Sequence, residues 1–332
     1  MFSLNILDYS PVDEGSDARE ALLQTTELAK RADQLGYRRF WVSEHHNVLS
    51  VANSSPEMLM MHLATSTSTI RIGSGGVMLP HYSSYKVAEN FRMLEALHPN
   101  RIDLGVGRSP SYQIVNKALN EEKGTRQSYE QKVKDLQKYL TDNTLEDHRF
   151  RKLMATPKTK TSPEIWMLGT SSRSGVIAAE NGSAYVFGHF ANPSEKGIEA
   201  VTNYRKHFKP SSLLEIPNTM IALFAVVADT EEEAEEIAKA FDLWLLFVES
   251  NNPPAYYPSI ETAKRRGFSS VEQEKVSENR KRMIIGTPQQ VKEEIEKVAN
   301  WFQADEVMII PNVSGFQNRL RGIELLAEAF QL

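Results

Sequence analysis

The sequence predicts a (β/α)8 barrel that forms a single domain over residues 1–332. Short apolar runs rich in β-branched residues alternate with amphipathic helical patterns almost to the C-terminus, which is typical of parallel strands joined by crossover helices. No internal repeat, low-complexity tract or linker divides the chain. Eight strands are expected, the number that closes such a barrel, at about residues 2–9, 38–44, 70–79, 101–107, 164–169, 184–188, 219–228 and 305–311.

Helical periodicity follows most of these strands. In the first helix, Ala21, Leu28 and Leu35 share one face, and Gly36 follows as a left-handed C-cap residue would. Ser55-Pro56 and Thr287-Pro288 have the composition of helix N-termini. Further helices are predicted at about residues 84–97, 128–142, 172–181, 194–208, 230–249, 287–303 and 315–330.

Two long polar segments, residues 109–127 and 250–285, interrupt this alternation. The second contains Pro253, Pro254 and Pro258, and both are longer than ordinary connections between elements. Functional loops of such a barrel lie at the C-terminal ends of its strands. We therefore expect both segments to be insertions that form a lid over the barrel mouth.

The composition favours a globular protein that acts on a small molecule. Hydrophobic residues make up 41% and charged residues 24%, close to the globular average, so a buried core is expected. The net charge is −5 and there is no polybasic run, which argues against nucleic acid and anionic lipid as partners. Because there are no cysteines, disulfides, thiol catalysis and Cys-ligated metals are excluded, and redox chemistry would need a cofactor.

The N-terminal stretch MFSLNILDYSPVDEG lacks the basic region and apolar run of a signal peptide. No uninterrupted apolar run approaches the length of a membrane span. A cytoplasmic location is the expectation that follows.

Two adjacent histidines, His45 and His46, follow the second predicted strand. Since successive strand residues point to opposite faces, we expect one of them to face the barrel mouth and the other to be packed behind it. His45 is our candidate for proton transfer, and two structural histidines are an equally simple interpretation. Adjacent histidines diverge and no third ligand is near in the sequence, so no metal site is predicted.

Within the third predicted strand, Ile70-Arg71-Ile72 leads into the glycine-rich run Gly73-Ser74-Gly75-Gly76. The absence of Cβ atoms at Gly75 and Gly76 would let a flat ring lie against the backbone beside Ser74. A bulge or a tight turn would explain the same glycines.

The fourth and fifth predicted strands lead into residues suited to phosphate. Arg108 brings a planar guanidinium to the mouth, although a surface salt bridge would also explain it. After the fifth strand, a hydroxyl-rich turn opens a helix, whose N-terminus favours anions, and we expect phosphate there in preference to a simple serine N-cap. No Rossmann or P-loop motif is present, so the ligand is expected to be a mononucleotide or a sugar phosphate. The residues of this turn are Thr170, Ser171, Ser172, Arg173 and Ser174.

Taken in order, five segments resemble the luciferase-like flavin monooxygenase family over nearly the entire chain. They are FWVSEHHN, IRIGSGGVMLP, KVAENFRMLEALHPNRIDLGVGRSP, EIWMLGTSSRSGVIAAENG and IIGTPQQVKEEIEKV. The resemblance implies a TIM barrel, FMN as cofactor and a homodimer.

The resemblance also implies roles for individual residues. His45 matches the family's mechanistic histidine, and Ser74-Gly75 matches a peptide that is often non-prolyl cis beneath the flavin ring. Arg108 matches a phosphate-binding arginine, and the phosphate cradle corresponds to Thr170, Ser171 and Ser174. A cysteine found beside the flavin in bacterial luciferase is Gly107 here and the aldehyde site is not recognisable, so light emission is not implied.

The implied reaction is a monooxygenation of a small organic substrate. A separate flavin reductase would supply reduced FMN, because the chain has no nicotinamide-binding fingerprint. Oxygen would add at the flavin C4a position to give a peroxide, and His45, with a reference pKa near 6.5, would exchange a proton near neutral pH.

Three other functions remain open at this point. They are hydride transfer with a deazaflavin on the same barrel, a catalytically silent flavin-binding protein, and a sugar-phosphate isomerase, for which no carboxylate or lysine base is evident. The homodimer is also expected because two predicted helices, at about residues 55–68 and 84–97, carry more apolar surface than one barrel-facing stripe would use. The residues concerned are Met58, Met60, Met61, Leu63, Phe91, Met93, Leu94 and Leu97.

Overall fold

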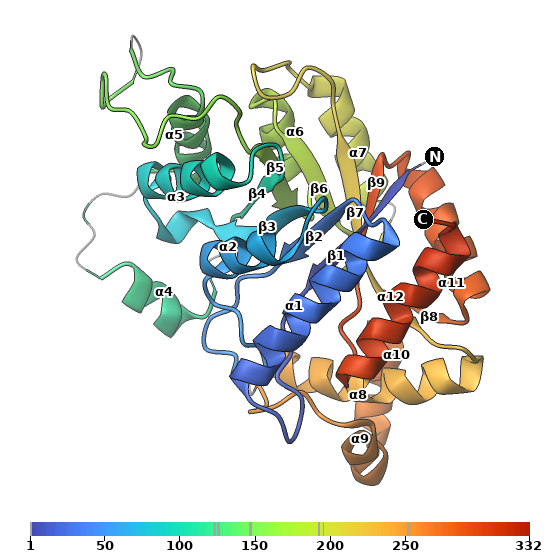
Figure 1. Ribbon diagram of the computed structural model, residues 1–332. Coiled ribbons are helices and arrows are strands. Elements are labelled where there is room, and N and C mark those ends of the chain that lie inside the picture. Colours follow the sequence, from blue (N-terminus) through green and yellow to red (C-terminus); the bar gives the residue numbers. More distant parts are fainter. Residues whose placement is uncertain are drawn as a thin grey trace.

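Parallel strands close into a barrel at the centre of the structure, with helices around it (Figure 1). The computed structural model describes residues 2–109, 111–121, 124, 127–145, 148–191, 193–194, 196–250 and 253–332. The ring runs β1-β2-β3-β4-β5-β6-β7-β9, and β9 pairs with β1 to close it, so the predicted (β/α)8 barrel is confirmed. Its strands are β1 Ser3–Asp8, β2 Arg39–Val42, β3 Arg71–Met78, β4 Ile102–Gly107, β5 Glu164–Gly169, β6 Ala184–Gly188, β7 Thr219–Val227 and β9 Glu306–Ile310.

The helices cover the outside of this ring, and side-chain N-caps begin many of them. Asp17 caps α1, and Gly36 ends it in the left-handed conformation that the sequence predicted. No helix in the described part of the chain is long and apolar enough to cross a bilayer. The helices are α1 Ala18–Leu35, α2 Pro56–Ser66, α3 Ser84–Leu97, α4 Gln113–Leu119, α5 Tyr129–Leu140, α6 Ser172–Glu180, α7 Lys196–His207, α8 Glu231–Glu249, α9 Ile260–Arg266, α10 Ser270–Arg280, α11 Pro288–Phe302 and α12 Phe316–Phe330.

The two segments predicted as polar insertions contain regular structure that the sequence analysis did not assign. Helix α4 lies within residues 109–127, and α9 and α10 lie within 250–285. A ninth strand, β8 (Met283–Gly286), pairs with the C-terminal half of β7, beyond the half that pairs with β6. In Figure 1, α4, α9 and α10 lie toward the lower side of the view, away from the labelled N and C ends.

The N-terminal end of the barrel interior holds a group of charged side chains that we call the basal charge network. It consists of Arg39, Arg71, Asp103, Glu164 and Glu306. Arg39 is fully buried and binds Asp103 through Nη1 at 2.8 and 2.9 Å and Glu306 through Nε at 2.8 Å. Residues at this end of a (β/α)8 barrel serve stability, whereas the functional loops lie at the opposite end.

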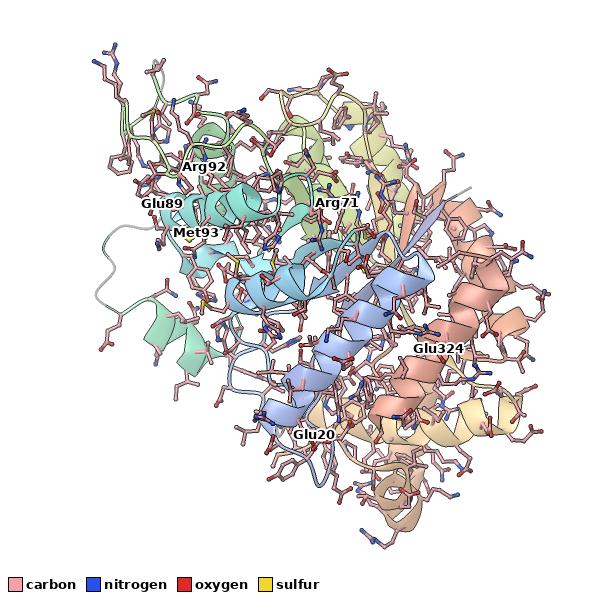
Figure 2. The ribbon with its side chains drawn as sticks, viewed as in Figure 1. Glu20, Arg71, Glu89, Arg92, Met93 and Glu324 are labelled. Carbon is pink, nitrogen blue, oxygen red and sulfur yellow. The ribbon has the colours of Figure 1, made fainter. Side chains whose placement is uncertain are left out.

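The apolar surface of α2 and α3 is smaller than the sequence suggested. Met60, Leu63, Phe91 and Leu94 belong to the buried core, because both helices pack on the barrel more broadly than one stripe. Of the residues predicted as apolar surface, Met58, Met93 and Leu97 remain largely exposed. Met93 lies on α3 with Glu89 and Arg92 (Figure 2). The homodimer stays a prediction. The apolar surface that could form its interface is reduced to the exposed Met58, Met93 and Leu97 and the half-buried Met61.

Candidate active site

A cavity of about 790 Å³ opens where the barrel strands end. Its volume is within the usual range for cofactor and substrate sites. The lining comes from residues of the eight barrel strands, from the loops that follow several of them, and from α5, α6 and α8. The lining residues are Leu7, Tyr9, Trp41, Ser43, Glu44, His45, His46, Val48, Gly75, Gly76, Met78, Gly107, Arg108, Ser109, Ser111, Tyr112, Tyr129, Met167, Leu168, Gly169, Thr170, Ser171, Ser174, Ile177, Val186, Gly188, Phe190, Ala222, Trp244, Val248 and Met308.

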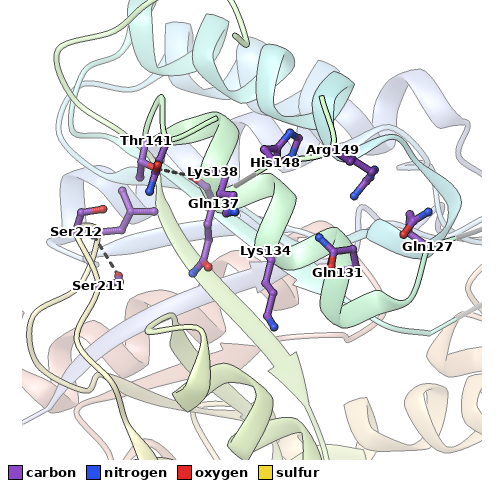
Figure 3. A pocket seen from close by; sticks show the side chains of 12 residues that line it. Gln127, Gln131, Lys134, Gln137, Lys138, Thr141, His148, Arg149, Ser211 and Ser212 are labelled. Atoms are coloured by element: carbon purple, nitrogen blue, oxygen red, sulfur yellow. Dashed lines mark hydrogen bonds between the residues drawn. The ribbon is translucent and has the colours of Figure 1, made fainter. Parts of the chain in front are cut away.

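A second cavity, of about 580 Å³, lies between α5 and residues 211–213 (Figure 3). Its lining is polar and includes Gln131, Lys134 and Gln137 of α5 and Ser212 of the neighbouring loop. It shares no lining residue with the cavity at the strand ends and contains none of the predicted site residues. The cavity at the strand ends is therefore the candidate active site.

Both histidines of the second strand end line this cavity, so the expectation that only one would do so is wrong. Strand β2 ends at Val42, and the alternation of faces does not continue into the loop that carries His45 and His46. The Nδ1 atom of His45 lies 2.9 Å from the Ser43 hydroxyl, and its ring packs on Tyr9 with centroids 4.9 Å apart. Its Nε2 atom makes no hydrogen bond to the described residues and can meet a ligand.

The environment of His45 makes its imidazole neutral in the unliganded protein. Burial and the neighbouring His46 lower the pKa of His45 to about 4. This environment therefore does not support the expected titration near neutral pH. When Nδ1 carries the hydrogen and donates it to the Ser43 hydroxyl, the neutral His45 can accept a proton or a hydrogen bond at Nε2.

Glu44 is a buried member of the site that the sequence analysis did not select. Its Oε2 accepts the Met78 backbone N–H at 2.8 Å, and its Oε1 accepts the Tyr82 hydroxyl at 2.6 Å. The same Oε1 lies 2.7 Å from Nε2 of His46. Glu44 therefore joins the end of β2 to the end of β3. The signal available in the sequence was an acidic residue directly before two histidines.

Small residues line the third and fourth strand ends. Gly75 and Gly76 line the cavity, and the peptide between them is cis, one residue later than the predicted Ser74-Gly75. Ser74 is fully buried and exchanges hydrogen bonds with the backbone of Gly105, so it does not line the cavity. A Cβ atom added at Gly107 would meet no atom within 4 Å, which leaves the space above this residue open.

Arg108 and the turn before α6 meet at the same cavity, as predicted. Arg108 lines the cavity and forms no ion pair with any residue in the described ranges. Ser171 caps α6 and shares a capping box with Ser174, so part of this hydroxyl pattern does serve capping. The Thr170 side chain and the N-terminus of α6 remain available for an anion.

Two predicted phosphate ligands lie outside the cavity lining. The Arg173 side chain is 73% exposed and its Nη2 lies 3.3 Å from Oε1 of Glu130. The Ser172 hydroxyl accepts a hydrogen bond from Asn203 at 2.7 Å. Both residues occupy the first turn of α6, where successive side chains point in different directions. Among the residues described, no group of three or more His, Asp and Glu is placed to hold a metal ion.

Apolar side chains form a further wall of the cavity. Trp244 of α8 is fixed by a hydrogen bond of 3.1 Å from Nε1 to the Ser50 hydroxyl and by stacking on Tyr257 at 5.5 Å. Val248 and Phe190 extend the wall. From the sequence, α8 was predicted only as a helix at about residues 230–249 and none of its residues was placed in the site, although the run from Phe241 to Val248 is apolar on more than one face. The rest of the apolar lining includes Leu7, Tyr9, Val48, Val186, Ala222 and Met308.

The two predicted lid segments differ in their relation to the cavity. Ser109, Ser111 and Tyr112 of the first segment line it. Within residues 253–285, no described residue lines it, and Tyr257 lies behind Trp244. A lid function for either segment stays a prediction.

Comparisons with known proteins agree over the entire chain. A family model described as luciferase-like monooxygenase matches residues 2–303. The uncharacterized protein YwcH of Bacillus subtilis is 48% identical, with 99% of each chain covered. The N-acetyl-S-alkylcysteine monooxygenase of the same organism is 36% identical and covers 99% of this chain and 98% of its own. The crystal structure of apo-MsnO8 superposes with a TM-score of 0.90 at 33% identity, over 100% of this chain and 99% of that chain.

More distant solved structures share the fold and differ in cofactor. One is the oxygenating constituent of 3,6-diketocamphane monooxygenase from Pseudomonas putida in complex with FMN, with a TM-score of 0.70 at 18% identity, over 99% of this chain and 97% of that chain. Another is an F420-dependent secondary alcohol dehydrogenase, with a TM-score of 0.68 at 14% identity, over 99% of this chain and 98% of that chain. At these identities the likeness concerns the barrel alone.

Proposed function

The chain belongs to the luciferase-like monooxygenase family, and from this we propose that it uses reduced FMN and oxygen to oxidise a small organic substrate. The observation that carries the proposal is the convergence on one cavity of a guanidinium with no ion pair among the described residues, a helix N-terminus and a glycine-lined floor. These are the groups that a flavin mononucleotide needs for its phosphate and for its ring.

The phosphate of FMN would bind between Arg108 and the N-terminus of α6. Arg108 has no competing carboxylate among the described residues, and Thr170 and the capped helix end offer further donors. Arg173 pairs with Glu130 at 3.3 Å and does not line the cavity, so it would not take part.

The flavin ring would lie over Gly75, Gly76 and Gly107. The open space above Gly107 is where a larger residue would obstruct a flat ring. When bound, reduced FMN would supply the two electrons with which one oxygen atom of O2 enters the substrate and the other leaves as water.

Two further tasks belong to the protein. The apolar wall of Trp244, Val248 and Phe190 would exclude water from the reacting groups. His45, neutral at physiological pH, would accept a proton at Nε2. Because an apolar wall favours an apolar, uncharged group, and because a relative is named for N-acetyl-S-alkylcysteines, we propose a thioether or a comparably apolar group as the site of oxidation.

The proposed partners follow from the same chemistry. A separate flavin reductase would supply reduced FMN, because the chain has no nicotinamide fingerprint. A homodimer is proposed on the resemblance and on exposed Met58, Met93 and Leu97.

Hydride transfer with a deazaflavin is the second candidate, since the barrel also occurs in an F420-dependent dehydrogenase. The two functions are separated by anaerobic fluorescence titration of the protein with reduced FMN and, in parallel, with reduced F420. We expect tighter binding of reduced FMN. Preferential binding of F420, or no binding of reduced FMN, would contradict the proposal.

A catalytically silent flavin-binding protein is tested by product formation. The protein, a flavin reductase, NADH, FMN and N-acetyl-S-methylcysteine are incubated under ¹⁸O2, and the thioether is analysed by mass spectrometry. We expect one ¹⁸O atom in the product, with no incorporation when the protein is omitted. Flavin binding without oxygen transfer to this thioether or to other apolar probes would identify a binding protein.

A further inference from the structure

The second histidine of the site, His46, is held by a hydrogen-bond network that does not include His45. Its Nε2 lies 2.7 Å from Oε1 of Glu44 and 3.4 Å from the Tyr82 hydroxyl. Its Nδ1 makes no hydrogen bond to the described residues. Both His46 and Glu44 line the cavity, so this network faces the same space as His45.

The network determines which nitrogen of His46 carries the proton. As a carboxylate, Glu44 has acceptors only, and its Oε2 is occupied by the Met78 N–H at 2.8 Å. The Tyr82 hydroxyl donates to Oε1 at 2.6 Å. Burial, reinforced by the hydrogen bond to Glu44, raises the pKa of Tyr82, so its hydroxyl keeps the proton that it donates. An unprotonated His46 Nε2 would face the lone pairs of the carboxylate, and Nε2 must therefore carry hydrogen.

We propose that Glu44 is a positioning residue that fixes His46 with its proton on Nε2 and its Nδ1 as a free acceptor, making His46 a second proton-handling group beside His45. The consequence for catalysis rests on the proposed function, whereas the tautomer itself does not. A proton that Nδ1 accepts from an acidic group in the cavity gives an imidazolium whose Nε2–H faces Glu44, and the same proton leaves from Nδ1 when the imidazole is restored.

Charged and titratable groups among the described residues surround His46 or act on its partners. Glu44 and His45 are its neighbours in the loop, Tyr82 approaches it from the end of β3, and Glu57 of α2 acts on Glu44 and Tyr82 through its charge. Glu57 makes no hydrogen bond to His46, so it offers a matched control. Glu57→Gln removes a nearby carboxylate charge and leaves the Glu44–His46 contact in place.

The test uses the full-length protein without flavin. Long-range ¹H–¹⁵N spectra of ¹⁵N-histidine-labelled protein report which ring nitrogen is protonated, and a His46→Gln variant assigns the signal. We expect His46 to be protonated on Nε2 in the wild type, in Glu57→Gln and in Tyr82→Phe. In Glu44→Gln, the amide can present its NH2 group to Nε2, and we expect the proton to move to Nδ1 in a large part of the molecules.

A wild-type His46 protonated mainly on Nδ1, or an unchanged Nε2 tautomer in Glu44→Gln, would overturn the assignment. If Glu44→Gln does not fold, as judged by its circular dichroism melting curve, the wild-type and Tyr82→Phe spectra decide the matter. In turnover assays, we expect Glu44→Gln to lower kcat by about tenfold or more with a smaller change in KM. Equal kcat values in Glu44→Gln and the wild type would show that the position of the His46 proton does not affect turnover. Failure of FMN binding alone would contradict the proposed function and leave the tautomer assignment standing.

Discussion

Replacing Arg39 with methionine removes the positive charge at the centre of the basal charge network. Arg39 is fully buried and forms hydrogen bonds with Asp103 and Glu306, while Glu164 lies 3.0 Å from its Nη2. Asp103 would keep Arg71 as a partner at 2.7 Å, whereas Glu306 would keep only neutral donors and the more distant Arg38 at 3.8 Å. The main cost is therefore the uncompensated buried carboxylate of Glu306.

We expect Arg39→Met to lower the free energy of unfolding by about 3–5 kcal/mol, the usual cost of removing one partner of a buried ion pair. This is a large fraction of the roughly 5–15 kcal/mol that stabilises an ordinary protein. The measurement is urea-induced unfolding followed by tryptophan fluorescence. Arg39→Lys, which keeps the charge and loses the planar fork, is the matched control and should cost less.

The loss of unfolding free energy in Arg39→Met should depend on pH. Burial alone would raise the pKa of Asp103 and of Glu306, but Arg39 and its neighbours hold both below their ordinary values. These carboxylates therefore stabilise the native state above the unfolded pKa of about 4, and the contribution is lost as pH falls through the lower native pKa. Without Arg39, Glu306 can be relieved by protonation. The difference between wild type and variant should shrink between pH 7 and about pH 4.5. A difference below about 1 kcal/mol at pH 7, or one that does not change with pH, would refute the reasoning.

Further predictions concern the cavity and the assembly. Arg108→Ala should weaken FMN binding by about 1.5–3 kcal/mol in fluorescence titrations, whereas Arg173→Ala should leave it within about 0.5 kcal/mol; equal effects would remove Arg108 from the site. His45→Asn should keep FMN binding within about 1 kcal/mol and lower single-turnover rates by roughly 10²-fold. Because the pKa of His45 is lowered to about 4, its contribution to the wild-type rate should be constant from about pH 5.5 to 8.5; equal rates in both proteins would make this histidine structural. Gly107→Leu should weaken FMN binding by about 1–3 kcal/mol through steric obstruction, with Gly107→Ala as the smaller control. Unchanged FMN binding by the leucine variant would show that the flavin ring does not lie over Gly107. Sedimentation at micromolar concentration should give a dimer, and a monomeric mass would contradict the proposed assembly.

The sequence predicted the barrel because most of its strands are short, largely buried segments rich in apolar residues, and because helical patterns alternate with them. It did not predict β8, since the four residues Met283–Gly286 stand inside a polar segment and pair with β7 alone. Helix α10 was also not assigned, because only Asn279 of this helix is buried and Val271 is exposed, which leaves little periodic signal.

In the site, residues that directly follow strands could be placed from the sequence, as Arg108 and Thr170 show. The direction of a side chain in a loop or a helix turn could not, and for this reason Arg173 was assigned to the phosphate and His46 to a packed position. Trp244 could not be found either, because a helix that closes a cavity has the same apolar pattern as one that packs on the core.

The pairing of β1 with β9 has a consequence for synthesis of the chain. The side chain of Asn5 donates to Glu306 across 301 residues of sequence, so the barrel cannot close before β9 has left the ribosome. At translation rates of about 5–20 residues per second, the outer edge of β1 stays unpaired for roughly 15–60 s. Such an edge can recruit strands from other nascent chains. Protein yield in cells should therefore depend on how well chaperones shield this edge during translation, independently of the stability of the finished barrel.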